Sequence, residues 1–387
     1  MLVQSVLFRF AERDTVRLMI LSLALAAAAV AAVPARAASL AEMAGQMVLV
    51  GFKGESVDDT SVKALTAEIA KGQIGGVMYL KPNVKSLDAV RAMNAAFKAA
   101  HPGLPPFITL DQEGGKVQRL TSAVGFPEMP SALDMANGHV PKAAGIIYSR
   151  TATELADLGF NVNFGPVVDL NINPANPIIG KYGRSFSADP NKVITYAEAF
   201  INAHHKAGVL TALKHFPGHG SSTTDSHKGF VDISATWSPK ELTPYKTLIK
   251  DEDIDFVMVG HLYDKKYDAP GDKLQLPSSL SPVWIGKVLR ADIGFKGVVI
   301  SDDLEMGAIR DMFKPASDEE IVRQTVIKAV NAGVNVLLFS NTAAYNPKLG
   351  EEVQSILIDE GQKDPAFAKK IEASYKLIVA LKSKIKV

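Results

Sequence analysis

Short apolar segments alternate with helical segments along almost the whole chain, and this alternation limits the possible folds more than any other feature. Eight segments are rich in apolar and β-branched residues: 47–52, 74–80, 106–111, 160–165, 210–215, 256–260, 297–302 and 334–339. Most are continuously hydrophobic, which is typical of strands covered on both faces. The spacing of apolar residues elsewhere predicts helices over 58–71, 86–100, 142–158, 191–207, 239–251, 282–291, 318–332 and 365–382.

This alternation is compatible with a closed barrel or with a doubly wound open sheet. Glycine ends several of the predicted helices, as is common at helix C-termini: Gly72, Gly159, Gly208, Gly294 and Gly333. Eight strands favour the barrel. An open sheet usually has a GxGxxG loop after its first strand, and residues 52–55 lack that spacing. With no linker or midway shift in composition, the sequence predicts an α/β fold, a single-domain (β/α)8 TIM-type barrel over residues 38–387.

The first 37 residues have the layout of a secretory signal peptide. Three arginines precede an apolar run over 18–33, and Ala35-Arg36-Ala37 forms an A-x-A type cleavage site. The alternative is a retained membrane anchor, for which the run is somewhat short. No later segment is long and apolar enough to cross a membrane. We therefore expect an exported protein, periplasmic or secreted, with no membrane association after cleavage.

Charge and cysteine content exclude several classes of function. The formal net charge is +1, and removing residues 1–37 would take away four arginines and two acidic residues, leaving about −1. A nearly neutral chain gives no reason to expect nucleic acid as a partner. The chain has no cysteine, so disulfides, thiolate nucleophiles and cysteine-ligated metals are excluded.

Polar residues follow most of the predicted strands. Asp111, Asp169, His261 and the pairs Lys214-His215 and Asp302-Asp303 lie at or just beyond strand ends. A single such residue is commonly a helix cap or a turn residue. Strand ends converge on one face of a barrel, where the active sites of such folds lie. The pattern therefore predicts a catalytic or binding site at this face.

The segment 214–227, KHFPGHGSSTTDSH, is the richest in candidate residues. Its glycines, proline and Ser/Thr run predict a loop. Asp225 and His227 are close enough for the carboxylate to orient the imidazole, as a general acid/base requires. The three histidines and Asp225 are alternatively a divalent metal site, but the spacing is not His-Glu-x-x-His and Lys214 would place a positive charge beside the ion. We expect no metal and no organic cofactor.

Several motifs together resemble glycoside hydrolase family 3, in its β-N-acetylglucosaminidase branch. The segment 214–227 is similar to that branch's KHFPGHG…DSH signature, and 111–119 (DQEGGKVQR) to its DQEGG-x-VQR segment. Further matches, in the family's order, are NFGPVVD at 163–169 (with Gly165 replacing the more usual Ala), GRSFS at 183–187, LSP at 280–282 and GVVISDD at 297–303. Larger members add a second α/β domain, for which we expect too little chain after the eighth strand.

The resemblance implies an exo-acting β-N-acetylhexosaminidase that forms a covalent glycosyl–enzyme intermediate. Asp302 matches the family nucleophile, His227 this branch's unusual acid/base, and Asp225 its orienting partner. Positions that hold the sugar's hydroxyls and acetamide are matched by Asp111, Arg119, Arg184, Lys214 and His215. An extended strand turns neighbouring side chains to opposite sides, so we expect only one of Asp302 and Asp303 to face the site, with Asp303 as a turn cap.

Two other functions remain open. A phosphorylase would use inorganic phosphate in place of water, and a neutral histidine, unlike an anionic acid/base, would not repel phosphate. A periplasmic glycan-binding protein without catalysis is the third possibility, although the nucleophile and the acid/base pair argue against it. The natural glycan (peptidoglycan fragments, chitooligosaccharides or another), the tolerance at the sugar C2 position and the oligomeric state are not predicted.

Overall fold

The computed structural model describes residues 37–101, 103–268 and 274–386. The predicted signal peptide thus lies, except for Ala37, outside the described residues. The contacts divide the chain into residues 1–39 and 40–387, and the fold below is that of the second unit. It contains an eight-stranded sheet in the order β10-β1-β2-β3-β6-β7-β8-β9. Its strands are β1 Val48–Gly51, β2 Gly76–Tyr79, β3 Phe107–Leu110, β6 Val162–Asn163, β7 Leu210–Phe216, β8 Phe256–Val259, β9 Val298–Ser301 and β10 Leu337–Phe339.

The sheet closes into a barrel. All neighbouring strands are parallel, and β9 meets β10 through a parallel bridge between Ile300 and Val336. The backbone N–H of Ser301 donates to the carbonyl of Val336 at 3.1 Å, completing the circle. Every residue of these strands is buried, because helices cover the outer face and side chains fill the interior. The predicted (β/α)8 barrel is confirmed, with one strand in each of the eight predicted segments.

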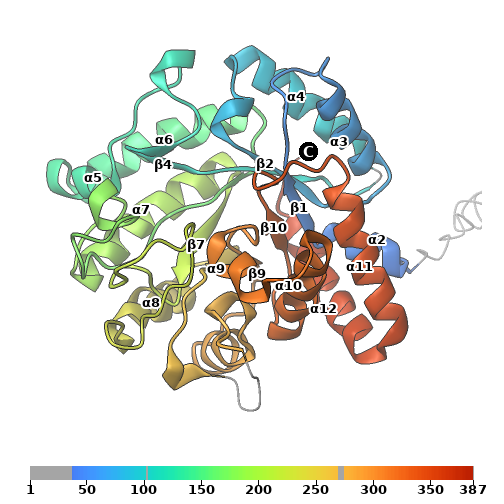
Figure 1. Cartoon of the computed structure of the whole chain (residues 1–387). Coiled ribbons are helices and arrows are strands. Elements are labelled where there is room, and N and C mark those ends of the chain that lie inside the picture. The colour runs from blue at the N-terminus through green and yellow to red at the C-terminus, as the bar shows by residue number, and fades with distance from the viewer. Residues whose placement is uncertain (1–36, 102, 269–273, 387) are drawn as a thin grey trace, which may run out of the picture. The chain divides into compact units, whose positions relative to one another are not determined.

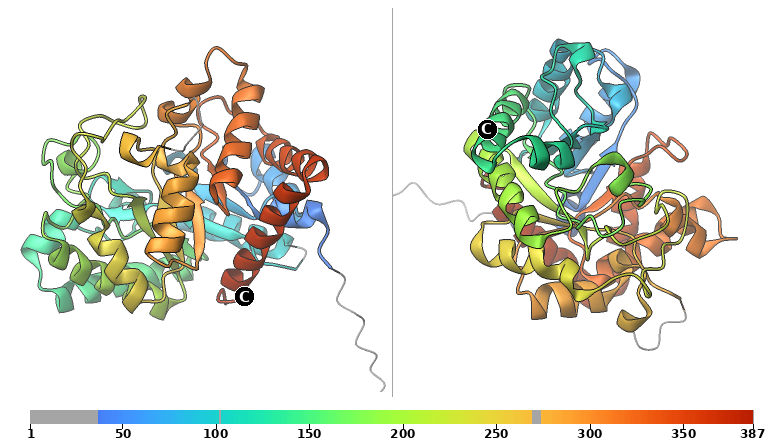
Figure 2. Two further views of the ribbon diagram at one scale, coloured as in Figure 1. Left: turned by 90° about the horizontal axis from the view of Figure 1, so that it is seen from below. Right: turned by 90° about the vertical axis from the view of Figure 1, so that its left-hand side faces the viewer.

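Helices surround the strands on all sides (Figure 1, Figure 2). The α-helices are α2 Leu40–Gln46, α3 Thr60–Ala70, α4 Leu87–Ala100, α5 Ala132–Gly138, α6 Pro141–Asp157, α7 Pro190–Ala207, α8 Thr243–Asp251, α9 Gly307–Arg310, α10 Asp318–Ala332, α11 Leu349–Lys363 and α12 Pro365–Lys382. Between β8 and β9, residues Val283–Asp292 form a π-helix. Among the described residues, no helix has the length and apolar character needed to cross a bilayer.

The five glycines predicted to end helices have the conformation expected there, whereas several further elements were not predicted. Each of the five helix-ending glycines has a positive φ, the left-handed conformation that glycine adopts without steric cost. Helices α2, α5, α9 and α11 and the short hairpin β4 Gln112–Gly114 with β5 Val117–Gln118 were missed. Of these, α2, α5, α9 and the hairpin are short, whereas α11 has 15 residues with a buried stripe that includes Leu349, Val353 and Leu357 and could have been predicted.

A buried lysine lies at the end of the barrel opposite to the polar strand ends. Lys382, in α12, donates hydrogen bonds from Nζ to Gln46 Oε1 at 2.6 Å and to the carbonyl of Gly75 at 2.7 Å. The same Nζ lies 4.5 Å from the centroid of the Phe107 ring. Since these partners immediately precede or begin the first three strands, α12 ties the start of the barrel to a late element of the chain.

Candidate active site

A cavity of about 400 Å³ opens at the carboxyl ends of the strands. Seven of the eight predicted site residues line it: Asp111, Arg119, Arg184, Lys214, His215, His227 and Asp302. The eighth, Asp225, contacts His227. The volume lies in the range of about 300–1,000 Å³ common for small-ligand sites. Residues far apart in sequence are thus brought to one face, as the strand-end pattern predicted.

Lys214 and Asp111 form the centre of a buried charge network. The Nζ of Lys214, whose side chain is 2 % exposed, lies 2.6 Å from Asp111 Oδ1 and 2.6 Å from Glu113 Oε1. Arg119 donates to the other oxygen of Asp111, also at 2.6 Å. Burial would raise the pKa of Asp111, but Lys214 and Arg119 outweigh it and hold that pKa well below its ordinary value. The Asp111 carboxylate is therefore a fixed negative group at the cavity wall.

Arg184 is held by Glu113, a residue to which the sequence analysis gave no role. The guanidinium donates to both carboxylate oxygens of Glu113, at 2.7 and 2.8 Å, the bidentate geometry that orients arginine most firmly. Burial acts to raise the pKa of Glu113, and Arg184 with Lys214 lowers it overall. Glu113 lies two residues after Asp111, beyond the same strand, and this position is the sequence feature that could have indicated a role in the site.

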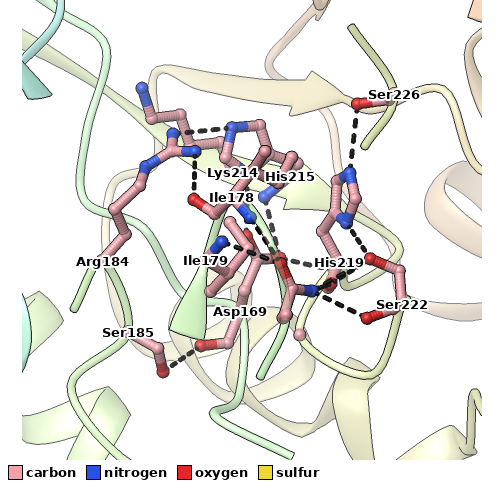
Figure 3. Close-up of polar contacts among 12 residues, drawn as sticks. Asp169, Ile178, Ile179, Arg184, Ser185, Lys214, His215, His219, Ser222 and Ser226 are labelled. Atoms are coloured by element: carbon pink, nitrogen blue, oxygen red, sulfur yellow. Dashed lines mark hydrogen bonds and ion pairs between the residues drawn. The ribbon is translucent and has the colours of Figure 1, made fainter. Parts of the chain in front are cut away.

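His215 is fixed by Asp169, which was recognised as a strand-end residue without an assigned role. Its Nδ1 lies 2.7 Å from Asp169 Oδ2, and its Nε2 lies 3.3 Å from Nη2 of Arg184, as Figure 3 shows. Asp169 also accepts from the backbone N–H groups of His215 and His219. One buried carboxylate thus sets both the loop that follows β7 and the orientation of the His215 ring.

Asp302 and Asp303 follow β9, and both line the cavity. β9 ends at Ser301, so strand alternation does not apply to the pair, and the two carboxylates differ instead in the groups that they contact. Asp303 is engaged elsewhere: its Oδ1 accepts from the N–H groups of Ser340 and Glu305 at 2.8 and 3.1 Å, which includes the expected turn contact. Burial raises its pKa to about 6.

The surroundings of Asp302 favour its anionic form. Burial acts to raise the pKa of Asp302, but the imidazoles of His215, His261 and His227 and the N–H of Asp303 outweigh burial, so the pKa is lowered. His261 also donates to the Asp303 carbonyl at 2.9 Å and contacts Ser279 Oγ at 2.8 Å. The carboxylate is therefore ionised, at a firmly held backbone position, and open to the cavity.

Asp225 and His227 form a pair in the long loop after β7. Asp225 Oδ1 lies 2.8 Å from His227 Nδ1 and accepts from the His227 N–H at 3.0 Å. The His227 side chain is 61 % exposed, against 16 % for Asp225. The Asp225 carboxylate therefore binds Nδ1 of His227, and Nε2 of the same ring is available to a ligand in the cavity.

The histidines of this loop do not share one centre. His215 contacts Asp169, His219 contacts Ser222 and Ser226, and His227 contacts Asp225. In the described part of the chain, no three His, Asp or Glu side chains are grouped in a way that could hold a metal ion.

Comparison with known proteins agrees with this geometry. Residues 39–371 match the Glycosyl hydrolase family 3 N terminal domain. The chain is 30 % identical over 377 residues to "Beta-hexosaminidase A" of Pseudoalteromonas piscicida, covering 89 % of this chain and 61 % of that protein. It is 32 % identical over 368 residues to an "Uncharacterized secreted glycosyl hydrolase" of Arthroderma benhamiae, covering 92 % and 97 %.

The solved structures include a glycoside hydrolase family 3 beta-N-acetylglucosaminidase from Paenibacillus sp. str. FPU-7. It is 28 % identical with a TM-score of 0.78, and the match covers 90 % of this chain and 63 % of that one. The chain therefore belongs to glycoside hydrolase family 3, through that family's N-terminal domain. It spans about three fifths of the length of the Pseudoalteromonas and Paenibacillus proteins.

Proposed function

We propose that this protein is a retaining exo-β-N-acetylhexosaminidase that removes terminal β-linked N-acetylglucosamine from glycans. One observation carries the proposal: an ionised carboxylate, Asp302, and a carboxylate-oriented imidazole, His227, line the same cavity from different elements. A nucleophile and a proton donor at one small cavity are the minimum that retaining glycoside hydrolysis requires. The names of two relatives, a beta-hexosaminidase and a beta-N-acetylglucosaminidase, support the sugar.

In the proposed reaction, the Asp302 carboxylate attacks the anomeric carbon and the bond to the leaving group breaks. His227 donates its Nε2 proton to the departing oxygen, while Asp225 stabilises the imidazolium character at Nδ1. Water then attacks the glycosyl–aspartate ester, with His227 removing its proton, and the sugar leaves with its original anomeric configuration. A histidine supports this chemistry near neutral pH without the burial that a carboxylic acid would need.

The remaining residues of the cavity are suited to a neutral, hydroxyl-rich ligand with one apolar group. Asp111, Arg119, Arg184, Lys214 and His215 present hydrogen-bonding groups that the network around them holds in place. Met78, Ile178 and Met306 add apolar surface, which suits the methyl of an acetamide. Peptidoglycan fragments and chitooligosaccharides both carry such a sugar, and we propose them as natural substrates.

We also propose that the protein is exported. The predicted signal peptide over residues 1–37 supports this, as does the relative named as a secreted glycosyl hydrolase. Cell fractionation with N-terminal sequencing of the recovered protein tests it, and an uncleaved protein that stays in the cytoplasm would contradict it.

Product analysis tests the proposed reaction. The protein is incubated with 4-nitrophenyl N-acetyl-β-glucosaminide in the presence and absence of inorganic phosphate, and the sugar product is followed by NMR. We expect free N-acetylglucosamine, appearing first as the β-anomer, under both conditions. Accumulation of the 1-phosphate would identify a phosphorylase, and binding without turnover a glycan-binding protein. A panel of aryl glycosides that differ at C2 then measures the tolerance at that position.

Replacement of His227 with Ala tests the acid. We expect kcat/KM to fall by about 10²–10⁴-fold for an alkyl or sugar leaving group, and by less than about tenfold for a dinitrophenyl leaving group that departs without protonation. The slope of log kcat/KM against the leaving-group pKa is the measurement. Equal losses for both kinds of substrate would contradict the assignment.

A further inference from the structure

His219 lies in the same loop as Asp225 and His227, and both of its ring nitrogens contact later residues of that loop. Its Nδ1 lies 2.6 Å from Ser222 Oγ, and its Nε2 lies 3.1 Å from Ser226 Oγ. Figure 3 shows the ring bridging the two serines. All three residues are buried. The ring therefore spans the segment just before the acid/base pair and reaches the residue between its two members.

Ser226 is the buried anchor of that pair. It separates Asp225 from His227 in the sequence. Its side chain is buried against His219, whereas the His227 side chain is largely exposed. Its carbonyl accepts from the N–H of Ala308 at 3.1 Å, and the His227 carbonyl accepts from the N–H of Gly307, also at 3.1 Å. The turn that carries His227 is thus held by the contact between Ser226 and the His219 ring, and by hydrogen bonds from the backbone of α9.

His219 is itself held rigidly. Its N–H donates to Asp169 Oδ1 at 2.8 Å, and its carbonyl accepts from Asn176 Nδ2, also at 2.8 Å. Asn176 Nδ2 contacts Ser222 Oγ as well, at 3.0 Å. A side chain on such a fixed backbone can set the position of the more exposed turn that it contacts, because the backbone has little freedom to follow the turn.

The contacts of His219 suit a neutral ring. Serine hydroxyls donate or accept, so either neutral tautomer can bond to both Ser222 and Ser226. Burial lowers the pKa of His219 to about 4, against the opposing effect of Asp169. The charged and titratable groups that also influence the ring are His215 and Asp302. The neutral ring that burial favours can therefore make both serine contacts.

We propose that His219 is a positioning residue: through the Ser226 hydroxyl it holds the Asp225–His227 turn in the place where His227 reaches the departing oxygen. This inference rests on the proposed function and deepens it. The inference gives His219, the second histidine of the 214–227 segment, a task separate from sugar binding. It also makes Ser226 part of the acid/base machinery, although Ser226 does not touch the substrate.

A pair of amide substitutions separates the two contacts of the ring. The amide of His219→Gln can take the place of Nε2 and reach Ser226, whereas that of His219→Asn takes the place of Nδ1 and reaches only Ser222. Ser226→Ala removes the proposed contact from the other side. Each variant is assayed with a dinitrophenyl and with an alkyl N-acetyl-β-glucosaminide, and its melting temperature is compared with that of the wild type.

We expect His219→Asn and Ser226→Ala to lose about 10–100-fold in kcat/KM for the alkyl substrate, part of the range that proton donation supplies, and less than about threefold for the dinitrophenyl substrate. His219→Gln should recover most of the loss. Equal losses for both substrates, or no loss, in Ser226→Ala would overturn the proposal even if His219→Asn failed to fold. A wild-type protein without turnover of either substrate would instead overturn the proposed function.

Discussion

Replacing Asp302 with Ala should lower kcat for N-acetyl-β-glucosaminides by at least about 10⁴-fold, because removing the nucleophile of a covalent mechanism leaves only binding and the remaining polar groups. The fold should survive, since Asp302 lines the cavity and the hydrogen bond that its carboxylate accepts comes from the adjacent N–H of Asp303 at 2.8 Å, not from a distant element. Steady-state kinetics with an aryl substrate measures the loss, and circular dichroism with thermal melting checks the fold.

Asp303→Asn is the matched control. Its side chain holds the turn to Glu305 and the N–H of Ser340, and an amide retains an oxygen for those contacts, so kcat should fall far less than in Asp302→Ala. Trapping with a fluorinated glycoside, followed by peptide mass mapping, should label Asp302. A label on Asp303, or a larger loss in Asp303→Asn than in Asp302→Ala, would reverse the assignment of the nucleophile.

Replacing Lys214 with Met should lower the free energy of unfolding at pH 7 by about 3 kcal/mol, the lower part of the range for breaking a buried ion pair. The substitution removes the positive group 2.6 Å from both Asp111 and Glu113, while Arg119 and Arg184 continue to pair with them. Urea unfolding measures the change. Lys376→Met is the matched control, because Lys376 pairs with Glu372 at the surface, where an ion pair contributes little to stability.

The same variant should change how stability depends on pH. In the wild type, the folded-state pKa values of Asp111 and Glu113 are lowered, so these carboxylates stabilise the fold at pH above about 4, the unfolded value, and lose that contribution as the pH falls through their folded values. Without Lys214, one cation fewer opposes burial, so both folded-state pKa values should rise above those of the wild type. The difference between wild type and variant should therefore be largest near pH 7 and shrink as the pH falls below about 4 toward the lowered wild-type values. A constant difference would show that lost packing, not charge, is responsible.

The fold could be predicted because its signal is repeated and local. Most of the eight buried runs, such as that of β9, are continuously apolar, and glycines such as Gly208 stop helices between them. Closure depends on the pairing of β1 with β10, in which Val48 lies opposite Leu337, so the number of strands indicated it but no residue did. The π-helical geometry of Val283–Asp292 carried no visible signal, since its apolar spacing resembles that of an ordinary helix.

The site residues could be named from their positions at strand ends and from the family motifs. The short-range pair of Asp225 with His227 was also predicted, but the long-range pairings were not. Glu113 and Asp169 lie in recognised motifs, yet their partners Arg184 and His215 are 71 and 46 residues away. Such contacts follow from the three-dimensional convergence of strand ends. The buried position of His219 depends on the path of one loop, and a histidine in a glycine-rich segment is compatible with either a ligand or a structural contact.

Strand β1 is hydrogen-bonded on one side to β2 and on the other to β10, with Leu49 opposite Leu338. During synthesis the early strands therefore have an unsatisfied edge until the segment 337–339 is available, and α12 contributes Lys382 to the same end later still. Closing so long a loop is slow compared with local helix formation. Ring closure of this barrel therefore has to wait for the synthesis of β10, and a nascent chain stopped before β10 would expose two pairing edges to aggregation.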